Sequence, residues 1–167
     1  MEHKIISGKN DSVHYWVKGQ GENCIIFTHG ATMDHGLFRF QIEYFSQRYR
    51  VIVWDVPGHG LSRPYRGFSL PRAASELIGI LNRENIEKAH LVGQSMGGYI
   101  IQFVARDHPE RAMSLSAVGS SPLQPSYYSA LDIWLLSMAP RLLRFFPYSS
   151  LIKMIAKHVA IKETSRV

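Results

Sequence analysis

One short stretch of the chain is the most informative about its structure: Ala89-His90-Leu91-Val92-Gly93-Gln94-Ser95-Met96-Gly97-Gly98. Residues 89–92 predict a buried strand, and residues 97–107 predict a helix that Pro109 closes. Between them lies a pentapeptide of the form G-x-S-x-G. In a strand-turn-helix setting this pattern lifts the serine hydroxyl clear of the sheet edge, which makes Ser95 a candidate nucleophile.

The residues around Ser95 fit such a tight turn. Side chains at Gly93 and Gly97 would clash with the neighbouring helix and strand, so glycine is expected at both positions. The helix that follows Ser95 offers free backbone donors and a positive dipole end to developing negative charge. A Gly-Ser turn without chemistry is the alternative interpretation of the same residues.

The rest of the chain repeats the alternation of strand and helix. Residues 4–7 and 13–17 predict two antiparallel strands, and 23–28, 50–54 and 112–118 predict further buried strands. Helices are predicted over 37–47 and, with a start at 69–71, through 73–83. This alternation predicts a mostly parallel α/β sheet with right-handed crossovers. Asp55, directly after a strand, is expected to fix the following turn through local hydrogen bonds.

Composition excludes several classes of protein. The 167 residues are 46% hydrophobic and 19% charged, as in an ordinary globular domain. The N-terminus lacks the features of a signal peptide, and no apolar run is long enough to span a membrane. The one cysteine, Cys24, fits a small core residue in a reducing compartment, and we expect a cytoplasmic protein. The net charge of +6 comes without a nucleic-acid-binding motif, so no nucleic acid partner is expected.

From Ile25 to Pro122 the sequence resembles the α/β-hydrolase superfamily of serine esterases, lipases and lactonases. Three segments carry the resemblance: His29-Gly30-Ala31, Asp55-Val56-Pro57-Gly58-His59-Gly60-Leu61-Ser62, and the stretch around Ser95. The resemblance implies an α/β-hydrolase fold, a mostly parallel sheet flanked by helices and incomplete at its C-terminal end. Residues 1–122 would form the six-stranded core and residues 123–167 a helical cap segment.

The resemblance also implies a role for each matching residue. Ser95 would form an acyl-enzyme with a small-molecule substrate, and the backbone N–H groups of Met96 and Ala31 would bind the oxyanion. The supporting positions would be His29, Gly30, Gly93, Gln94 and Gly97. The family uses no metal and no organic cofactor for this chemistry. The expected function is hydrolysis of a carboxylic ester or a related acyl bond.

The catalytic acid and histidine are expected to be absent from this chain. In the family they follow strands beyond the sixth, and the turn at 118–122 has no carboxylate. Among the other histidines, His35 is the nearest alternative base, while His29 and His59 match structural positions. Asp34 and His35 lack a third metal ligand at useful spacing. Three explanations stay open: truncation before the acid and histidine, a partner chain that completes the sheet, or a non-catalytic binding or regulatory domain.

The C-terminal segment permits several interpretations. The apolar run over 131–146 would line a substrate pocket, pack on the core, or do both with different faces. Its basic flanks would also suit weak contact with a membrane surface or attraction of an acidic substrate: Arg141, Arg144, Lys153 and Lys157. A lyase, a peroxidase or a carbon–carbon hydrolase on the same fold is a further, narrower alternative.

Overall fold

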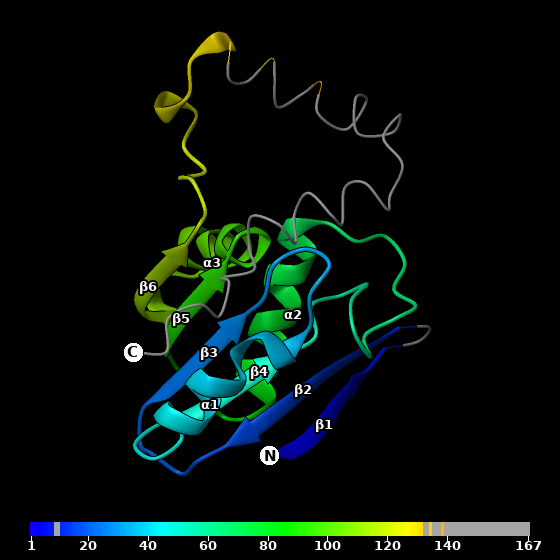
Figure 1. Ribbon diagram of the computed structural model, residues 1–167, viewed down its shortest axis with the longest axis vertical. Coiled ribbons are helices and arrows are strands. Elements are labelled where there is room, and N and C mark those ends of the chain that lie inside the picture. The colour runs from blue at the N-terminus through cyan, green and yellow to red at the C-terminus, as the bar shows by residue number, and fades with distance from the viewer. Residues whose placement is uncertain (9–10, 132–133, 135–137, 139–167) are drawn as a thin grey trace, which may run out of the picture. The chain divides into compact units, whose positions relative to one another are not determined.

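The computed structural model describes residues 1–8, 11–131, 134 and 138 and confirms the predicted α/β sheet (Figure 1). These residues form a six-stranded sheet in the order β1-β2-β4-β3-β5-β6. The strands are β1 (Glu2–Ser7), β2 (Ser12–Lys18), β3 (Cys24–Thr28), β4 (Arg50–Trp54), β5 (Ala89–Gln94) and β6 (Ala112–Val118). The helices are α1 (Arg39–Phe45), α2 (Leu70–Arg83) and α3 (Met96–Asp107), with 3-10 turns η1 (His35–Phe38), η2 (Pro109–Arg111) and η3 (Pro125–Tyr127).

Strands β3 to β6 are parallel, and β1 and β2 join them in antiparallel register. Every residue of β3 is buried, which explains its uninterrupted apolar sequence. The strands predicted at 50–54 and 112–118 form with those bounds. Because β3 and β5 are adjacent and parallel, the turns after them meet at the same edge of the sheet.

Helices cover both faces of the sheet. On one face α2 and α3 bury a large apolar cluster against β2 to β5, and residues such as Leu77, Ile80 and Ile100 are fully buried in it. The smaller cluster on the other face includes Phe38 and Ile42 from η1 and α1 (Figure 1). The helix predicted over 37–47 is shorter in the structure, where α1 covers only Arg39–Phe45. The carboxylate of Asp34 caps a 3-10 turn first, and the α-helix proper ends at Phe45.

The chain divides into two compact units, Met1–Leu123 and Gln124–Val167. The first holds all six strands of the described sheet. Most of the second, including nearly all of the apolar run at 131–146 and its basic residues, lies outside the described residues. Among the residues that are described, no helix has both the length and the apolar character to cross a bilayer.

A buried carboxylate ties the first strand to the core. Glu84 follows α2 and accepts hydrogen bonds from the Tyr15 hydroxyl at 2.7 Å and the Lys4 ammonium at 3.1 Å, and it also pairs with Arg50. Burial alone would raise the pKa of Glu84, but the hydrogen bonds from Tyr15 and Lys4 and the charges of Lys4 and Arg50 outweigh it and lower that pKa.

We expect Glu84→Gln to lower the free energy of unfolding by about 1–3 kcal/mol at pH 7, because its charge-assisted hydrogen bonds are lost. The lowered pKa means that ionised Glu84 stabilises the fold above its ordinary pKa of 4.5, and this stabilisation is lost as the pH falls through the folded value. The difference between wild type and variant should therefore shrink below that pH in urea unfolding. Asp107→Asn, at an exposed ion pair, is the control and should change little.

Helix α3 packs on the sheet by close backbone contact. A Cβ added at Gly97 would lie 2.1 Å from the Thr28 carbonyl oxygen of β3, far inside van der Waals contact. In contrast, a Cβ at Gly79 within α2 would lie 3.9 Å from its nearest neighbour, Ile6 Cδ1.

These two helical glycines should respond to alanine in opposite directions. Gly97→Ala should destabilise the fold by about 1–3 kcal/mol, because α3 has to move away from β3. Gly79→Ala should stabilise it by about 0.5–1 kcal/mol, because alanine is the better helix former and the site has room. Thermal and urea unfolding measure both variants. Equal effects at the two positions would contradict the packing described for α3.

Candidate active site

Ser95 occupies a sharp turn between β5 and α3. Its backbone has φ 50° and ψ −116°, a conformation that a non-glycine residue adopts only under strain. The turn is held on both sides: the Ser95 N–H donates to the Val118 carbonyl at 2.9 Å, and the Ser95 carbonyl accepts from the Ser120 hydroxyl at 2.7 Å. The side chain of Ser95 is half-buried at the carboxyl edge of the sheet.

The loop after β3 lies directly against this turn. A Cβ built on Gly30 would come within 3.1 Å of the Ser95 Cβ and 2.2 Å of the Gln94 side-chain oxygen. Glycine at position 30 therefore lets the two turns approach each other. The Gln94 side-chain oxygen is buried and has no hydrogen-bond partner among the described residues. The structure thus brings Gly30, Gln94 and Ser95 together.

Glycines also set how closely the strand and the helix approach at the turn. A Cβ on Gly93 would meet the Gly97 carbonyl oxygen at 2.4 Å, and one on Gly97 would meet the strand β3. Ser120, which the sequence did not single out, stabilises the turn from the end of β6. The sequence offered a signal for this contact: Ser120 directly follows the predicted strand at 112–118, and the carboxyl ends of adjacent parallel strands lie side by side.

The two predicted oxyanion donors are the N–H groups of Met96 and Ala31, which directly follow Ser95 and Gly30, the residues that approach each other at this turn. Met96 is the first residue of α3, where N–H groups have no acceptor within the helix. Ala31 follows Gly30 directly and is exposed at the same edge of the sheet. The dipole of α3 adds positive potential beside Ser95.

His29 is a buried structural bridge rather than a base. Its Nδ1 lies 2.7 Å from the Gly30 carbonyl oxygen and its Nε2 accepts from the Val56 N–H at 2.9 Å. These bonds require a proton on Nδ1 and none on Nε2. Burial lowers the pKa of His29, which keeps the ring neutral and the two loops connected.

Asp55 connects three segments at the same edge. Its fully buried carboxylate accepts hydrogen bonds from the backbone N–H groups of Leu61 at 2.7 Å and His35 at 2.9 Å. The bond from Leu61 lies within the turn that follows β4, and it is the kind of local bond that the sequence predicts for Asp55. The second bond joins a distant loop, and the His35 ring adds a 2.8 Å contact from Nδ1 while stacking on Trp16.

The described histidines all have partners other than Ser95. His35 pairs with Asp55, His59 Nδ1 lies 3.2 Å from the Pro57 carbonyl, and His90 Nδ1 lies 2.8 Å from the Ser114 hydroxyl. Within the described part of the chain, no histidine forms a hydrogen bond with the Ser95 hydroxyl. His158 lies outside that part. The described residues therefore place no histidine at the hydroxyl of Ser95, the predicted nucleophile.

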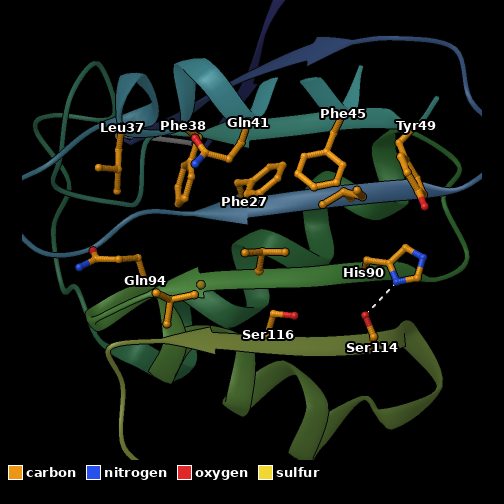
Figure 2. Close-up of a pocket in the computed structure, with 14 residues that line it drawn as sticks. Phe27, Leu37, Phe38, Gln41, Phe45, Tyr49, His90, Gln94, Ser114 and Ser116 are labelled. Atoms are coloured by element: carbon orange, nitrogen blue, oxygen red, sulfur yellow. Dashed lines mark hydrogen bonds between the residues drawn. The ribbon is translucent and has the colours of Figure 1, made fainter. Parts of the chain in front are cut away.

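A groove of about 570 Å³ lies on the α1 side of the sheet (Figure 2). Phe27 and Phe45 form its apolar wall, and His90, Ser114 and Ser116 lie on the strands at its other side. It reaches Gln94, next to the turn at Ser95, but Ser95 itself does not line it. The groove is therefore a feature of the sheet face next to β6 and not the space around the nucleophile.

Metal-ligating side chains do not gather in the described structure. Over residues 1–8, 11–131, 134 and 138, no group of three or more His, Cys, Asp or Glu side chains could hold an ion. Asp34, one of the two residues weighed as ligands, instead accepts a 2.8 Å hydrogen bond from the Gly36 N–H and caps η1.

Comparisons with known proteins agree with this geometry. A family model described as alpha/beta hydrolase fold matches residues 23–148. The pimeloyl-[acyl-carrier protein] methyl ester esterase of Aeromonas hydrophila is 37% identical over 131 residues, which are 77% of this chain and 47% of the esterase. The dihydrolipoyllysine-residue acetyltransferase component of the acetoin cleaving system of Cupriavidus necator is 36% identical over 64% of this chain and 29% of its own length.

Solved structures show the same fold. Est816, an N-acyl homoserine lactone degrading enzyme, superposes with a TM-score of 0.66 at 26% identity, covering 76% of this chain and 49% of Est816. A thermophilic esterase from Thermogutta terrifontis gives the same TM-score and identity over 75% of this chain and 49% of the esterase. The chain spans about half the length, or less, of the relatives that it matches. It belongs to the alpha/beta hydrolase fold family.

Proposed function

We propose that this chain carries the nucleophile of a serine hydrolase that cleaves a carboxylic ester or a related acyl bond. The observation that carries the proposal is the strained turn at Ser95, between β5 and α3 and against the Gly30 loop. A serine held at positive φ by packing on both sides has no conformational advantage over glycine, so the presence of a hydroxyl at this position favours chemistry.

The relatives support the same class of reaction. They include a methyl ester esterase at 37% identity and a lactone-degrading enzyme at 26% identity. Esters and lactones share a carbonyl carbon that a serine oxygen can attack and an alkoxide that leaves. The acyl group and the leaving alcohol of the substrate of this chain are not defined by these similarities.

The geometry supports a two-step reaction. The Ser95 oxygen attacks the carbonyl carbon and gives its proton to a base, while the Met96 and Ala31 N–H groups stabilise the negative oxygen. The carbonyl–oxygen bond to the leaving group then breaks, and the leaving oxygen takes the proton. Water hydrolyses the acyl-serine in the second step. The base and its acid partner come from outside the described residues.

A second candidate is a binding or regulatory domain that has the strained turn at Ser95 but catalyses no reaction. It is favoured by the engagement of His29, His35, His59 and His90 with groups other than Ser95. A serine hydroxyl without an adjacent base is a poor nucleophile at neutral pH. The two candidates differ in the reactivity of Ser95.

Several finer expectations belong to this proposal. A cytoplasmic location accords with a single cysteine, Cys24, which is buried. Contact of the cap segment with an acyl substrate or a membrane surface concerns residues 123–167, most of which lie outside the described ones. A small-molecule acyl substrate and the absence of a nucleic acid partner likewise stay predictions.

The proposal predicts that a fluorophosphonate probe labels Ser95. The full chain should gain one adduct by intact-mass spectrometry, and Ser95→Ala should lower the labelling rate at least about a hundredfold. The matched control is Ser114→Ala, because Ser114 is a serine of the groove whose hydroxyl lies 2.8 Å from a histidine nitrogen, His90 Nδ1. Labelling should persist in this variant.

Two results would contradict the proposal. An adduct that Ser114→Ala abolishes and Ser95→Ala leaves intact would place the reactive serine in the groove. No adduct on the folded wild-type chain would contradict activation of Ser95 within this chain, as a binding or regulatory domain or truncation before the acid and histidine requires, because a fluorophosphonate requires an activated hydroxyl. Circular dichroism of each variant confirms that it is folded.

A further inference from the structure

Four aromatic rings lie together on one face of β1 and β2, the two strands at one end of the described sheet (Figure 1). His3 of β1 is directly opposite Trp16 of β2, and their rings are stacked with centroids 4.7 Å apart. His14 stacks on His3 at 5.2 Å, and His35 from η1 stacks on Trp16 at 3.6 Å. The buried Trp16 ring is thus in contact with one imidazole from β1 and another from η1.

Two of the imidazole rings also meet through their nitrogens. His3 Nε2 lies 3.0 Å from His14 Nδ1, and His14 Nε2 lies 3.2 Å from the Ser12 hydroxyl. The contact between the two rings requires one nitrogen to donate and the other to accept, so a single proton lies between them. When both rings are protonated, two N–H groups and two positive charges face each other, and the hydrogen bond is lost.

The charges around His14 do not remove this conflict. Burial and the neighbouring His3 lower the pKa of His14, and they outweigh the carboxylate of Asp55, which acts in the opposite direction. The other polar partners of His14 are neutral: Ser12 contacts its ring, and the Ser62 hydroxyl accepts from its backbone N–H at 2.9 Å. No compensating charge therefore contacts the His14 ring among the described residues.

Acid has the opposite effect at the other end of the stack. His35 Nδ1 lies 2.8 Å from the buried carboxylate of Asp55. Protonation of the His35 ring keeps this hydrogen bond and adds charge attraction to it. An imidazolium stacked on Trp16 is also favourable. The Trp16 ring is therefore held on the side of η1 whether His35 is neutral or charged.

Strand β1 has two side-chain anchors, one on each face. Lys4 pairs with Glu84 on one face, and His3 contacts Trp16 and His14 on the other. The backbone of β1 pairs only with β2 within the described sheet. Because the pKa of Glu84 is lowered from 4.5, the first anchor persists at pH values where histidines become charged. Mild acid therefore acts on the second anchor alone.

We propose that His3 and His14 form an acid-sensitive contact that controls the attachment of β1. Protonation of both rings separates them, releases His3 from Trp16 and loosens the first half of β1, while Trp16 stays in contact with His35. The stabilisation from this contact is complete above the ordinary histidine pKa of 6.5, and it is lost as the pH falls through the lower folded value of His14. This device is independent of the proposed hydrolase activity.

Hydrogen exchange of the full chain, followed at single amides by NMR, tests the proposal. After correction for the intrinsic pH dependence of exchange, the protection of β1 amides should fall at least about tenfold between pH 7.5 and 5.0. In His14→Gln this pH dependence should disappear, because glutamine offers a hydrogen bond without titrating. His90→Gln is the matched control, since His90 contacts a serine hydroxyl at 2.8 Å and not a second histidine. It should keep the full pH dependence.

The histidine resonances give a second measurement that does not depend on the stability of β1. His14 should titrate below 6.5 in the wild type, and its midpoint should rise in His3→Gln, because the neighbouring positive charge is removed. His3 is exposed, so this substitution leaves the core packing unchanged.

Three outcomes would overturn the proposal. The first is β1 protection that is the same at pH 7.5 and pH 5.0 in the wild type. The second is a loss of protection that is equal in the wild type, His14→Gln and His90→Gln, since another group is then responsible. The third is an equal loss of protection in β3 and β5, which indicates that the whole sheet opens and not β1 alone.

Discussion

The close approach of α3 to β3 is the constraint on which the site depends. The Thr28 carbonyl occupies the space where a side chain on residue 97 would be. Because the helix begins so near the sheet, the chain must turn within one residue, and Ser95 takes up a φ of 50°. The strain costs about 1–3 kcal/mol, and the burial of Ile100, Ile101 and Val104 against the sheet offsets it. The Ser95 hydroxyl is thus placed by packing in the core and not by contacts of its own.

Buried polar groups hold the loops around that turn in register. His29 and Asp55 are fully buried at the ends of β3 and β4, and each uses its side chain to bind backbone of another segment. A buried polar group that lacks a hydrogen-bond partner destabilises a fold. Loop arrangements that break these bonds are therefore disfavoured relative to the one observed. A neutral His29 is part of this arrangement, since a proton on Nε2 would remove the acceptor for Val56. The edge that carries Ser95 is therefore preorganised by hydrogen bonds of buried side chains.

Local signals made much of this predictable from the sequence. Residues 50–54 and 112–118 form strands with the predicted bounds, because continuous apolar runs between turn residues specify buried strands. The elbow follows from glycine spacing, which is also local. The contacts of Glu84 with Lys4 and of Asp55 with His35 were not predicted, because they join segments 80 and 20 residues apart. The break between η1 and α1 was missed for another reason: apolar spacing at 38, 42 and 45 fits a continuous helix, and it does not reveal the Asp34 cap.

The position of β5 limits how Ser95 can acquire a base. A base has to lie about 3 Å from the serine oxygen, whereas strands are spaced by about 4.8 Å. Strand β6 already lies beside β5, and its Val118 carbonyl accepts the Ser95 N–H. Any strand added beyond β6 is therefore about 10 Å from β5, too far for a side chain within that strand to reach the hydroxyl. A base therefore has to reach Ser95 from above the carboxyl edge of the sheet and not from within a strand beyond β6. Completing the sheet and activating the serine are thus separate structural requirements. Strands added beside β6 do not by themselves bring a base to the Ser95 hydroxyl.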